Sequence, residues 1–245
     1  MRLVFIAIII AFALCSCSDN NPVDAGAPRI APAQVVAVTL PESLLVGTNV
    51  LVLVHWFPRD CGEKIDPLVP VSDGPRHWRI APHGVRPGYG YFCLDGLYCG
   101  ASLDTLNLAV PATGTDHYTL IGAYGTLDFD VAAGIGATGS GHRLTLFDQS
   151  GTPRANEVVR YYDRQGNTVL DSTITDSSGT ARVAPAPCTT IYETDLVIGD
   201  LCGFGTLRFF PFCGRALRTV MLYVPPPVYA TASEETASMY SVGRP

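Results

Sequence analysis

The sequence has few charged residues and almost no lysine. Charged side chains make up 16% of its 245 residues, whereas an average globular protein has about 25%. Lys64 is the single lysine, and the formal net charge is −6. Nucleic-acid binding and electrostatic attachment to anionic membranes both depend on an excess of basic side chains. This composition argues against both, and we predict no nucleic-acid partner.

The sequence also lacks any long stretch with the 3.6-residue period of an amphipathic helix. Short runs rich in β-branched and aromatic residues recur instead, and Gly, Pro, Asn and Asp separate them. This pattern is typical of an all-β sandwich or barrel. Both faces of the run at residues 50–57 are apolar, which predicts a central strand. Further strands are expected at residues 34–40, 78–80, 103–111, 117–125 and 126–132.

No catalytic, metal or phosphate-binding motif is convincing. Residues 134–139 match G-x-G-x-x-G, but a strand-like run follows them instead of the helix that a phosphate site requires. Ser140 lacks the first glycine of G-x-S-x-G. His77 and His83 share an irregular segment, yet no H-E-x-x-H or close histidine pair supports zinc. We therefore predict no catalytic residue, no metal and no cofactor.

Two carboxylates provide the enzymatic alternative. Asp128 and Asp130 are two positions apart in an expected strand, so both project from one face, about 7 Å apart. A pair at this spacing could bind Ca²⁺ or perform acid–base chemistry on a sugar. One interpretation is that Asp128 and Asp130 are solvent-facing strand residues without a chemical role. The alternative is that the protein is a carbohydrate-active enzyme or accessory domain that uses these carboxylates.

The N-terminal segment has the pattern of an export signal. Arg2 precedes an uninterrupted apolar run at residues 3–14. This run is too short to cross a membrane as a helix, which takes about 20 residues. A basic start followed by an apolar run of this length predicts a secretory signal peptide.

The apolar run ends in Leu14, Cys15, Ser16, Cys17, with a small residue just before the second cysteine. This end of the run resembles the lipobox of bacterial lipoproteins. The resemblance implies cleavage after residues 1–16, a lipid on the sulfur of Cys17, and a location in the bacterial cell envelope. The protein would then face the periplasm or the exterior from the outer membrane or cell surface. An ordinary signal peptide or an uncleaved anchor is the alternative.

Export determines how the remaining cysteines are interpreted. In an oxidising compartment an even number of cysteines at irregular spacing predicts structural disulfides. Zinc is disfavoured because no C-x-x-C pair occurs outside the leader. Several connectivities are open, and sequence cannot choose among them. The disulfide candidates are Cys61, Cys93, Cys99, Cys188, Cys202 and Cys213.

The second half has a repeated turn pattern. It reads Asp148-x-x-Gly-x-Pro153, then a strand, then Asp176-x-x-Gly179-x-Ala before a further strand. Asp caps such turns through backbone N–H groups, and Gly supplies positive φ. This pattern resembles the bacterial Ig-like, carboxypeptidase-regulatory-like and transthyretin-like β-sandwich modules. In the first half, the order of residues 38–54 and 106–125 is similar to that of the Ig-like modules of bacterial surface lipoproteins. The resemblance implies a stalk, spacer, adhesion or carbohydrate-contacting module.

These observations predict an all-β protein with two tandem Ig-like antiparallel β-sandwich domains. The expected order is a leader at 1–16, a flexible tether at 17–33, a first domain at 34–133, a Gly-rich linker at 134–141, a second domain at 142–224 and a disordered Pro-rich tail at 225–245.

Aromatic residues crowd the loop-rich part of the first half. If several reach one surface, they would form a stacking platform for sugar rings or for a protein partner; the alternative is that they fill the core. The predicted surface consists of Arg76, His77, Trp78, Tyr89, Tyr91 and Tyr98. We therefore predict a non-enzymatic module for binding, adhesion or spacing, which contacts the membrane through its lipid and either carbohydrate or an envelope protein.

Overall fold

The structure is a computed structural model, and every regular element that it describes is a β-strand. The described residues are 28–58, 63–86, 101–134, 142–163, 168–183, 194–198, 206–209 and 216–224. None of them forms a helix long and apolar enough to span a membrane. The predicted leader, Cys17, most of the tether, the linker from residue 135, the six disulfide candidates and the tail lie outside these ranges.

A six-stranded sheet runs through the centre of the fold, in the order β14-β11-β17-β2-β3-β8. Its strands are β2 (Gln34–Pro41), β3 (Asn49–Phe57), β8 (Ser102–Ala109), β11 (His142–Phe147), β14 (Thr180–Val183) and β17 (Leu217–Leu222). β11 and β17 are parallel, and the other pairs are antiparallel. β3 lies between β2 and β8 with nearly all of its side chains buried, as the apolar run predicts.

A four-stranded sheet packs on one face of the central sheet, in the order β10-β9-β6-β5. It contains β5 (Val71–Gly74), β6 (His77–Ile80), β9 (Thr115–Gly122) and β10 (Gly125–Ala132). β6 pairs with β9 in parallel. Strand alternation directs Leu127 and Phe129 inward, where they form one core with Val38, Leu40 and Val54.

A second four-stranded sheet belongs to the opposite face. Its order is β13-β12-β15-β16, with β12 (Val158–Asp163), β13 (Thr168–Ile174), β15 (Thr194–Ile198) and β16 (Thr206–Phe209). Val159 of β12 joins a core with Leu144, Leu146 and Met221. Met221 and Leu222 are neighbours in β17 and belong to different cores. Because successive side chains of a strand point to opposite faces, the two cores lie on opposite faces of the central sheet.

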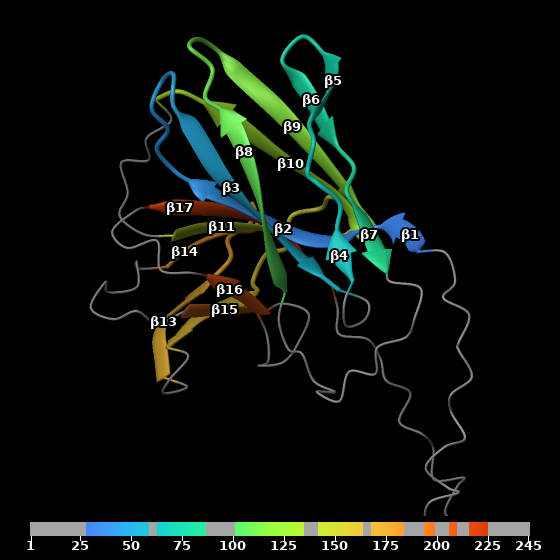
Figure 1. The fold of residues 1–245 in the computed structure, drawn as a ribbon. Helices are drawn as coiled ribbons and strands as arrows, with labels where there is room; N and C mark the ends of the chain where they lie inside the picture. The colour runs from blue at the N-terminus through green and yellow to red at the C-terminus, as the bar shows by residue number, and fades with distance from the viewer. Residues whose placement is uncertain are drawn as a thin grey trace, which may run out of the picture.

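The two four-stranded sheets therefore lie on opposite sides of the central sheet (Figure 1). β5, β6, β9 and β10 lie toward the upper side of this view, and β13, β15 and β16 lie below the central sheet. A small sheet, β1 (Arg29–Pro32), β7 (His83–Arg86) and β4 (Lys64–Ile65), completes the described elements.

The predicted all-β fold with several sheets is confirmed. Each predicted half contributes three neighbouring strands to the central sheet, and β2 joins β17 from Ala37↔Met221 to Pro41↔Leu217. Strands that precede and strands that follow the linker predicted at residues 134–141 therefore belong to one sheet. The number of tandem Ig-like domains is not confirmed by this arrangement and stays a prediction.

Two turns in the second half have the geometry that their sequence predicts. Asp148 Oδ1 accepts hydrogen bonds from the backbone nitrogens of Ser150 and Thr152, both at 2.9 Å. Asp176 Oδ1 accepts equivalent bonds at 2.8 and 3.0 Å. Gly179 has a φ of 71°, in the left-handed region that glycine tolerates. Hydrogen bonds from serine hydroxyls, above all, lower the pKa of both aspartates.

Candidate functional site

The outer face of the β10-β9-β6-β5 sheet carries a continuous set of polar side chains. Side chains of β10 point alternately to the two faces of the sheet, so Leu127, Phe129 and Val131 are buried and Asp128 and Asp130 point away from the core. In the same way β9 exposes His117 and β6 exposes His77 and Arg79. The strand period therefore places every one of these polar groups on one surface.

The first cross-strand row on this surface is Asp130, His117 and His77. These residues are register partners on β10, β9 and β6. His117 Nδ1 lies 2.6 Å from Asp130 Oδ1, and because an ionised carboxylate only accepts, Nδ1 carries the proton and donates. The rings of His77 and His117 stack with centroids 5.0 Å apart and an interplanar angle of 23°. The row thus fixes the orientation of His117 from both sides.

The second row consists of Asp128, Thr119 and Arg79. Thr119 Oγ1 donates to Asp128 Oδ1 at 2.7 Å, and Arg79 is the register partner of Thr119. Each carboxylate of the Asp128–Asp130 pair therefore has its own partner on β9. The two project from a sheet surface, whereas a glycosidase holds its two carboxyl groups on either side of the bond to be broken.

The three described residues of the predicted aromatic surface point in different directions. Trp78 faces inward: it stacks on Tyr118 with ring centroids 6.3 Å apart, and Tyr118 stacks on Phe129 at 5.3 Å. For Trp78 the core-filling alternative therefore holds. His77 is on the outer face. Arg76 is also exposed, where it donates to the carbonyl of Thr113 and forms an ion pair with Asp116 at 3.5 Å.

Three further members of that predicted surface, Tyr89, Tyr91 and Tyr98, lie outside the residues that the structure describes.

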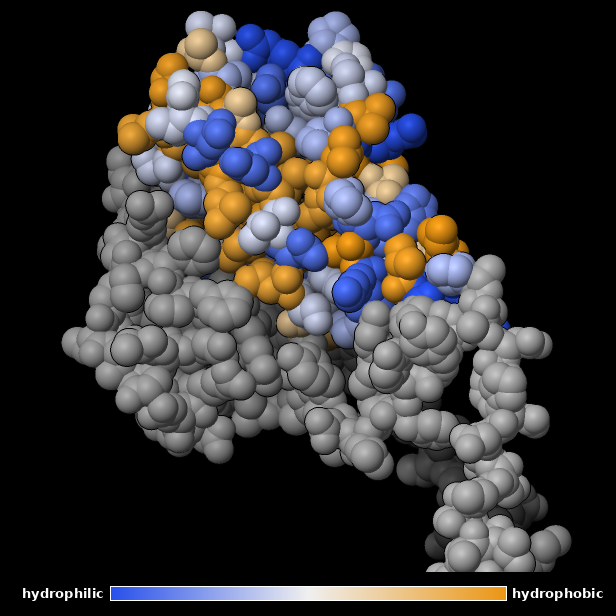
Figure 2. Space-filling model, viewed as in Figure 1, coloured by the Kyte–Doolittle hydropathy of each residue, from blue (hydrophilic) through white to orange (hydrophobic). Residues whose placement is uncertain are grey.

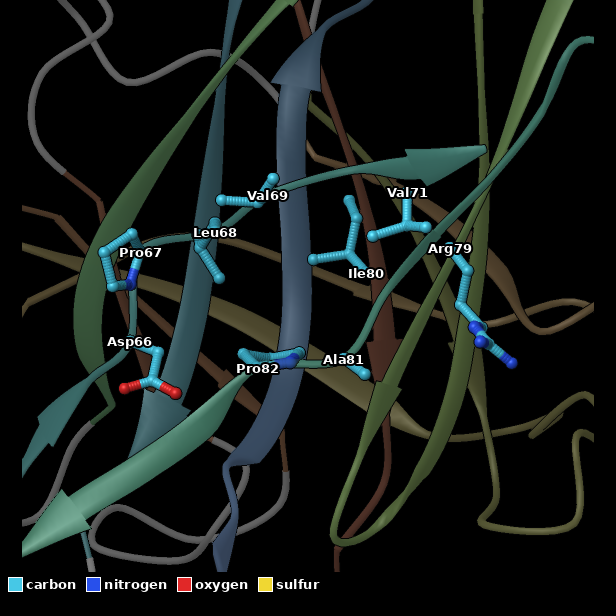
Figure 3. Close-up of a pocket in the computed structure, with 9 residues that line it drawn as sticks. All are labelled: Asp66, Pro67, Leu68, Val69, Val71, Arg79, Ile80, Ala81 and Pro82. Atoms are coloured by element: carbon cyan, nitrogen blue, oxygen red, sulfur yellow. The ribbon is translucent and has the colours of Figure 1, made fainter. Parts of the chain in front are cut away.

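A small pocket adjoins the outer face at Arg79. Its volume is about 210 Å³, below the roughly 300–1,000 Å³ of typical ligand sites. Leu68, Val69, Val71 and Ile80 contribute apolar walls, with Asp66 at one end and Arg79 at the other (Figure 3). Val69 and Val71 are 62% and 58% exposed. Apolar surface gathers in the middle of the space-filling view, over β8 and the region beside β6 (Figure 2).

The part of the chain that the structure describes holds no group of three or more His, Cys, Asp or Glu side chains that could coordinate an ion. His83, which the sequence places near His77, instead lies with its Nδ1 3.6 Å from Asp66 Oδ2.

Sequence reasoning missed a buried polar chain on the other face of the central sheet. His55 Nε2 is 3.1 Å from Thr39 Oγ1, Thr39 Oγ1 is 2.7 Å from Thr219 Oγ1, and Thr219 Oγ1 is 2.7 Å from His142 Nε2. If each hydroxyl donates one of these bonds and accepts another, one imidazole donates at Nε2 and the other accepts there. The available signals were the run at residues 50–57 with two apolar faces, which contains His55, and the alternation that begins with His142 in β11.

Burial dominates the electrostatics of both imidazoles. Removal from water lowers the pKa of His55 to about 3, and His142 adds a smaller repulsive effect. The pKa of His142 is also lowered to about 3 by burial. Both rings are therefore neutral in the folded protein at neutral pH.

No family model, curated protein or solved structure matches this chain.

Proposed function

We propose that the protein is a membrane-anchored bacterial lipoprotein that serves as a non-enzymatic module for binding, adhesion or spacing in the cell envelope. The observation that carries the binding role is the outer face of the β10-β9-β6-β5 sheet. There, the stacked pair His77–His117 and the exposed Arg79 lie beside the apolar pocket wall at Val71.

This surface suits carbohydrate or an envelope protein. Imidazole and guanidinium groups donate hydrogen bonds to hydroxyl and carbonyl oxygens, and a planar ring pair offers an apolar face for contact. Asp130 holds the ring of His117 at 2.6 Å, which reduces the side-chain entropy lost on binding. An open sheet surface of this kind favours contact with an extended partner over enclosure of a small one.

The anchor rests on the sequence Leu14-Cys15-Ser16-Cys17. Two or three acyl chains, each contributing about 0.8 kcal/mol per buried CH₂, hold a protein on a membrane where one chain barely does. Intact-mass analysis of membrane-extracted protein should give a mature N-terminus at Cys17 with added acyl mass. A soluble product that starts elsewhere would refute the anchor.

The binding surface is tested by His77→Ala combined with His117→Ala. Both side chains are exposed, so we expect the variant to fold as the parent does and to lose binding in glycan arrays and in crosslinked pull-downs from envelope extracts. Asn107→Ala is the matched control, because Asn107 is an exposed residue of β8, which belongs to a different sheet. Equal capture by parent and double variant would exclude this surface and favour a spacer without a ligand.

The enzymatic alternative has one specific observation in its favour. The His117 Nδ1–Asp130 Oδ1 contact of 2.6 Å resembles the way a carboxylate orients a general base. If the protein is a carbohydrate-active enzyme, Asp128→Asn and Asp130→Asn should abolish turnover of a polysaccharide that the parent cleaves. Absence of turnover by the parent would remove this alternative.

We further propose that residues 34–133 and 142–224 are two Ig-like units that share the central sheet through the β2–β17 pair. A protease site inserted in residues 134–141 tests this division. After cleavage, the two fragments should stay together in size-exclusion chromatography because of the β2–β17 hydrogen bonds. Each should retain strand signal in circular dichroism.

A further inference from the structure

Three arginines form a row across neighbouring strands of the central sheet. Arg143 on β11 is the register partner of Arg182 on β14 and of Arg218 on β17. Adjacent strands lie about 4.8 Å apart, so three guanidinium-bearing side chains leave the same face at close spacing. Strands β14, β11 and β17 lie side by side in Figure 1. Like charges directly opposite each other destabilise a sheet unless an anion compensates them.

Glu42 compensates only part of this charge. Its carboxylate is buried, and its Oε1 lies 3.1 Å from Arg143 Nε and 3.1 Å from Arg182 Nη2. Arg218 instead donates through Nη2 to the backbone carbonyl of Asp130, while its Nε is buried without a hydrogen-bond partner in the described structure. Burial and the charge of Arg143 lower the pKa of Arg218.

The other carboxylate whose charge acts on Arg218 belongs to Asp130, and it is shared. It contacts His117 on the outer face of the four-stranded sheet. Three guanidinium groups therefore meet two carboxylates, which leaves an excess of one positive charge on a chain whose overall charge is −6.

Hydroxyl groups continue the same face of the sheet next to the arginines. Thr145 and Thr180 are register partners, two positions along from Arg143 and Arg182. Their oxygens lie 3.4 Å apart. The side chains of Arg143 and Arg182 remain 33% and 44% exposed, so a solute can reach them. Guanidinium groups with neighbouring hydroxyls are the donors that multivalent oxyanions require.

We propose that the face of β14, β11 and β17 formed by Arg182, Arg143 and Arg218 binds a multivalent oxyanion, a phosphate or sulfate group. The oxyanion accepts hydrogen bonds from the exposed sides of Arg182 and Arg143. Because one of the hydroxyls of Thr145 and Thr180 donates to the other, the second of them is the further donor. Its negative charge offsets the excess that Glu42 leaves. This site is separate from the outer face of the β10-β9-β6-β5 sheet and does not depend on the lipid anchor.

Calorimetric titration of the intact exported protein tests the proposal, with inorganic phosphate and inorganic sulfate as probes at constant ionic strength in chloride. We expect saturable binding of at least one of them at one site per chain. Arg182→Gln, at the exposed edge of the sheet, should weaken it about tenfold, because a charge-assisted bond to an ionic group is lost. Arg29→Gln, an exposed arginine on β1, is the matched control and should leave the affinity unchanged.

Glu42→Gln distinguishes anion binding by the arginines from a purely structural role of the Glu42–arginine contacts. The carboxylate competes with the oxyanion for the same two arginines, so its neutralisation should strengthen anion binding even if it lowers the melting temperature. The proposal is overturned if neither anion binds saturably at millimolar concentration. It is equally overturned if Arg182→Gln and Arg29→Gln bind with the same affinity, or if Glu42→Gln does not tighten binding. Arg182→Lys, which keeps the charge, replaces Arg182→Gln if the latter fails to fold.

Discussion

Acidification should destabilise the protein at pH values well above 3.8, the ordinary pKa of an aspartate. His55 and His142 have folded-state pKa values of about 3, whereas unfolded histidine titrates near 6.5. Between these values the unfolded state binds more protons than the folded state, so the free energy of unfolding falls as the pH falls. The loss starts near pH 6.5 and ends only near pH 3.

The size of this effect follows from linkage. At pH 5.5, one unit below the unfolded pKa, each buried neutral histidine lowers the free energy of unfolding by about 1.4 kcal/mol relative to high pH. His55 and His142 together therefore cost about 3 kcal/mol, a large share of the roughly 5–15 kcal/mol that stabilises a typical domain. The lowered pKa values of Asp148 and Asp176 start from 3.8, so their contribution is lost mainly at lower pH.

Urea unfolding followed by circular dichroism between pH 7.5 and 5 measures this slope. His142→Gln can keep a polar group near Thr219 while removing the titration, so it should reduce the slope by about half. The double variant with His55→Gln should remove most of it. His83→Gln is the control, because that ring is 45% exposed. A flat stability curve in the parent, or an unchanged slope in the double variant, would refute the assignment of two buried neutral histidines.

Four substitutions should lower the free energy of unfolding, as measured in urea. Trp78→Ala removes a ring that stacks on Tyr118 and should cost about 3 kcal/mol. Thr219→Val interrupts the buried hydroxyl chain and should cost roughly 1–3 kcal/mol. Gly179→Ala and Gly47→Ala both place a Cβ at positive φ, yet only at Gly179 would it meet a backbone oxygen, at 2.4 Å. Gly179→Ala should therefore cost more than the roughly 1 kcal/mol expected of Gly47→Ala; equal costs would contradict this.

The period of two in the sequence identified the longer strands of the first half and their faces, but not the short strands β1, β4, β5 and β7. The expected strand at 34–40 is β2 (Gln34–Pro41), and the one at 126–132 is β10 (Gly125–Ala132). The same period places Asp128 and Asp130 on one face, which the structure shows. It also separates His77 from Trp78, because neighbours in a strand point to opposite sides.

Partners across the sheet were not predictable in the same way. Alternation specifies which face a side chain occupies, but not which distant strand lies beside it. The β2–β17 pair joins segments about 180 positions apart, as the Thr39–Thr219 contact shows, and nothing in either segment encodes that pairing alone. The buried histidine chain and the arginine row both arise from such pairings, so no local motif marks them.

Asp130 connects the two surfaces on which the proposals rest. Its side chain orients His117 on the outer face, and its backbone carbonyl accepts from Arg218 at the arginine row. Because β10 is the edge strand of its sheet and contacts β17, one residue of that edge can serve both sheets. A partner that places a cation beside the Asp130 carboxylate on the outer face would offset its charge, leave the arginine row more positive and favour an oxyanion there. Binding at one surface is therefore expected to favour binding at the other. The sign of this coupling follows from the charge of the Asp130 side chain.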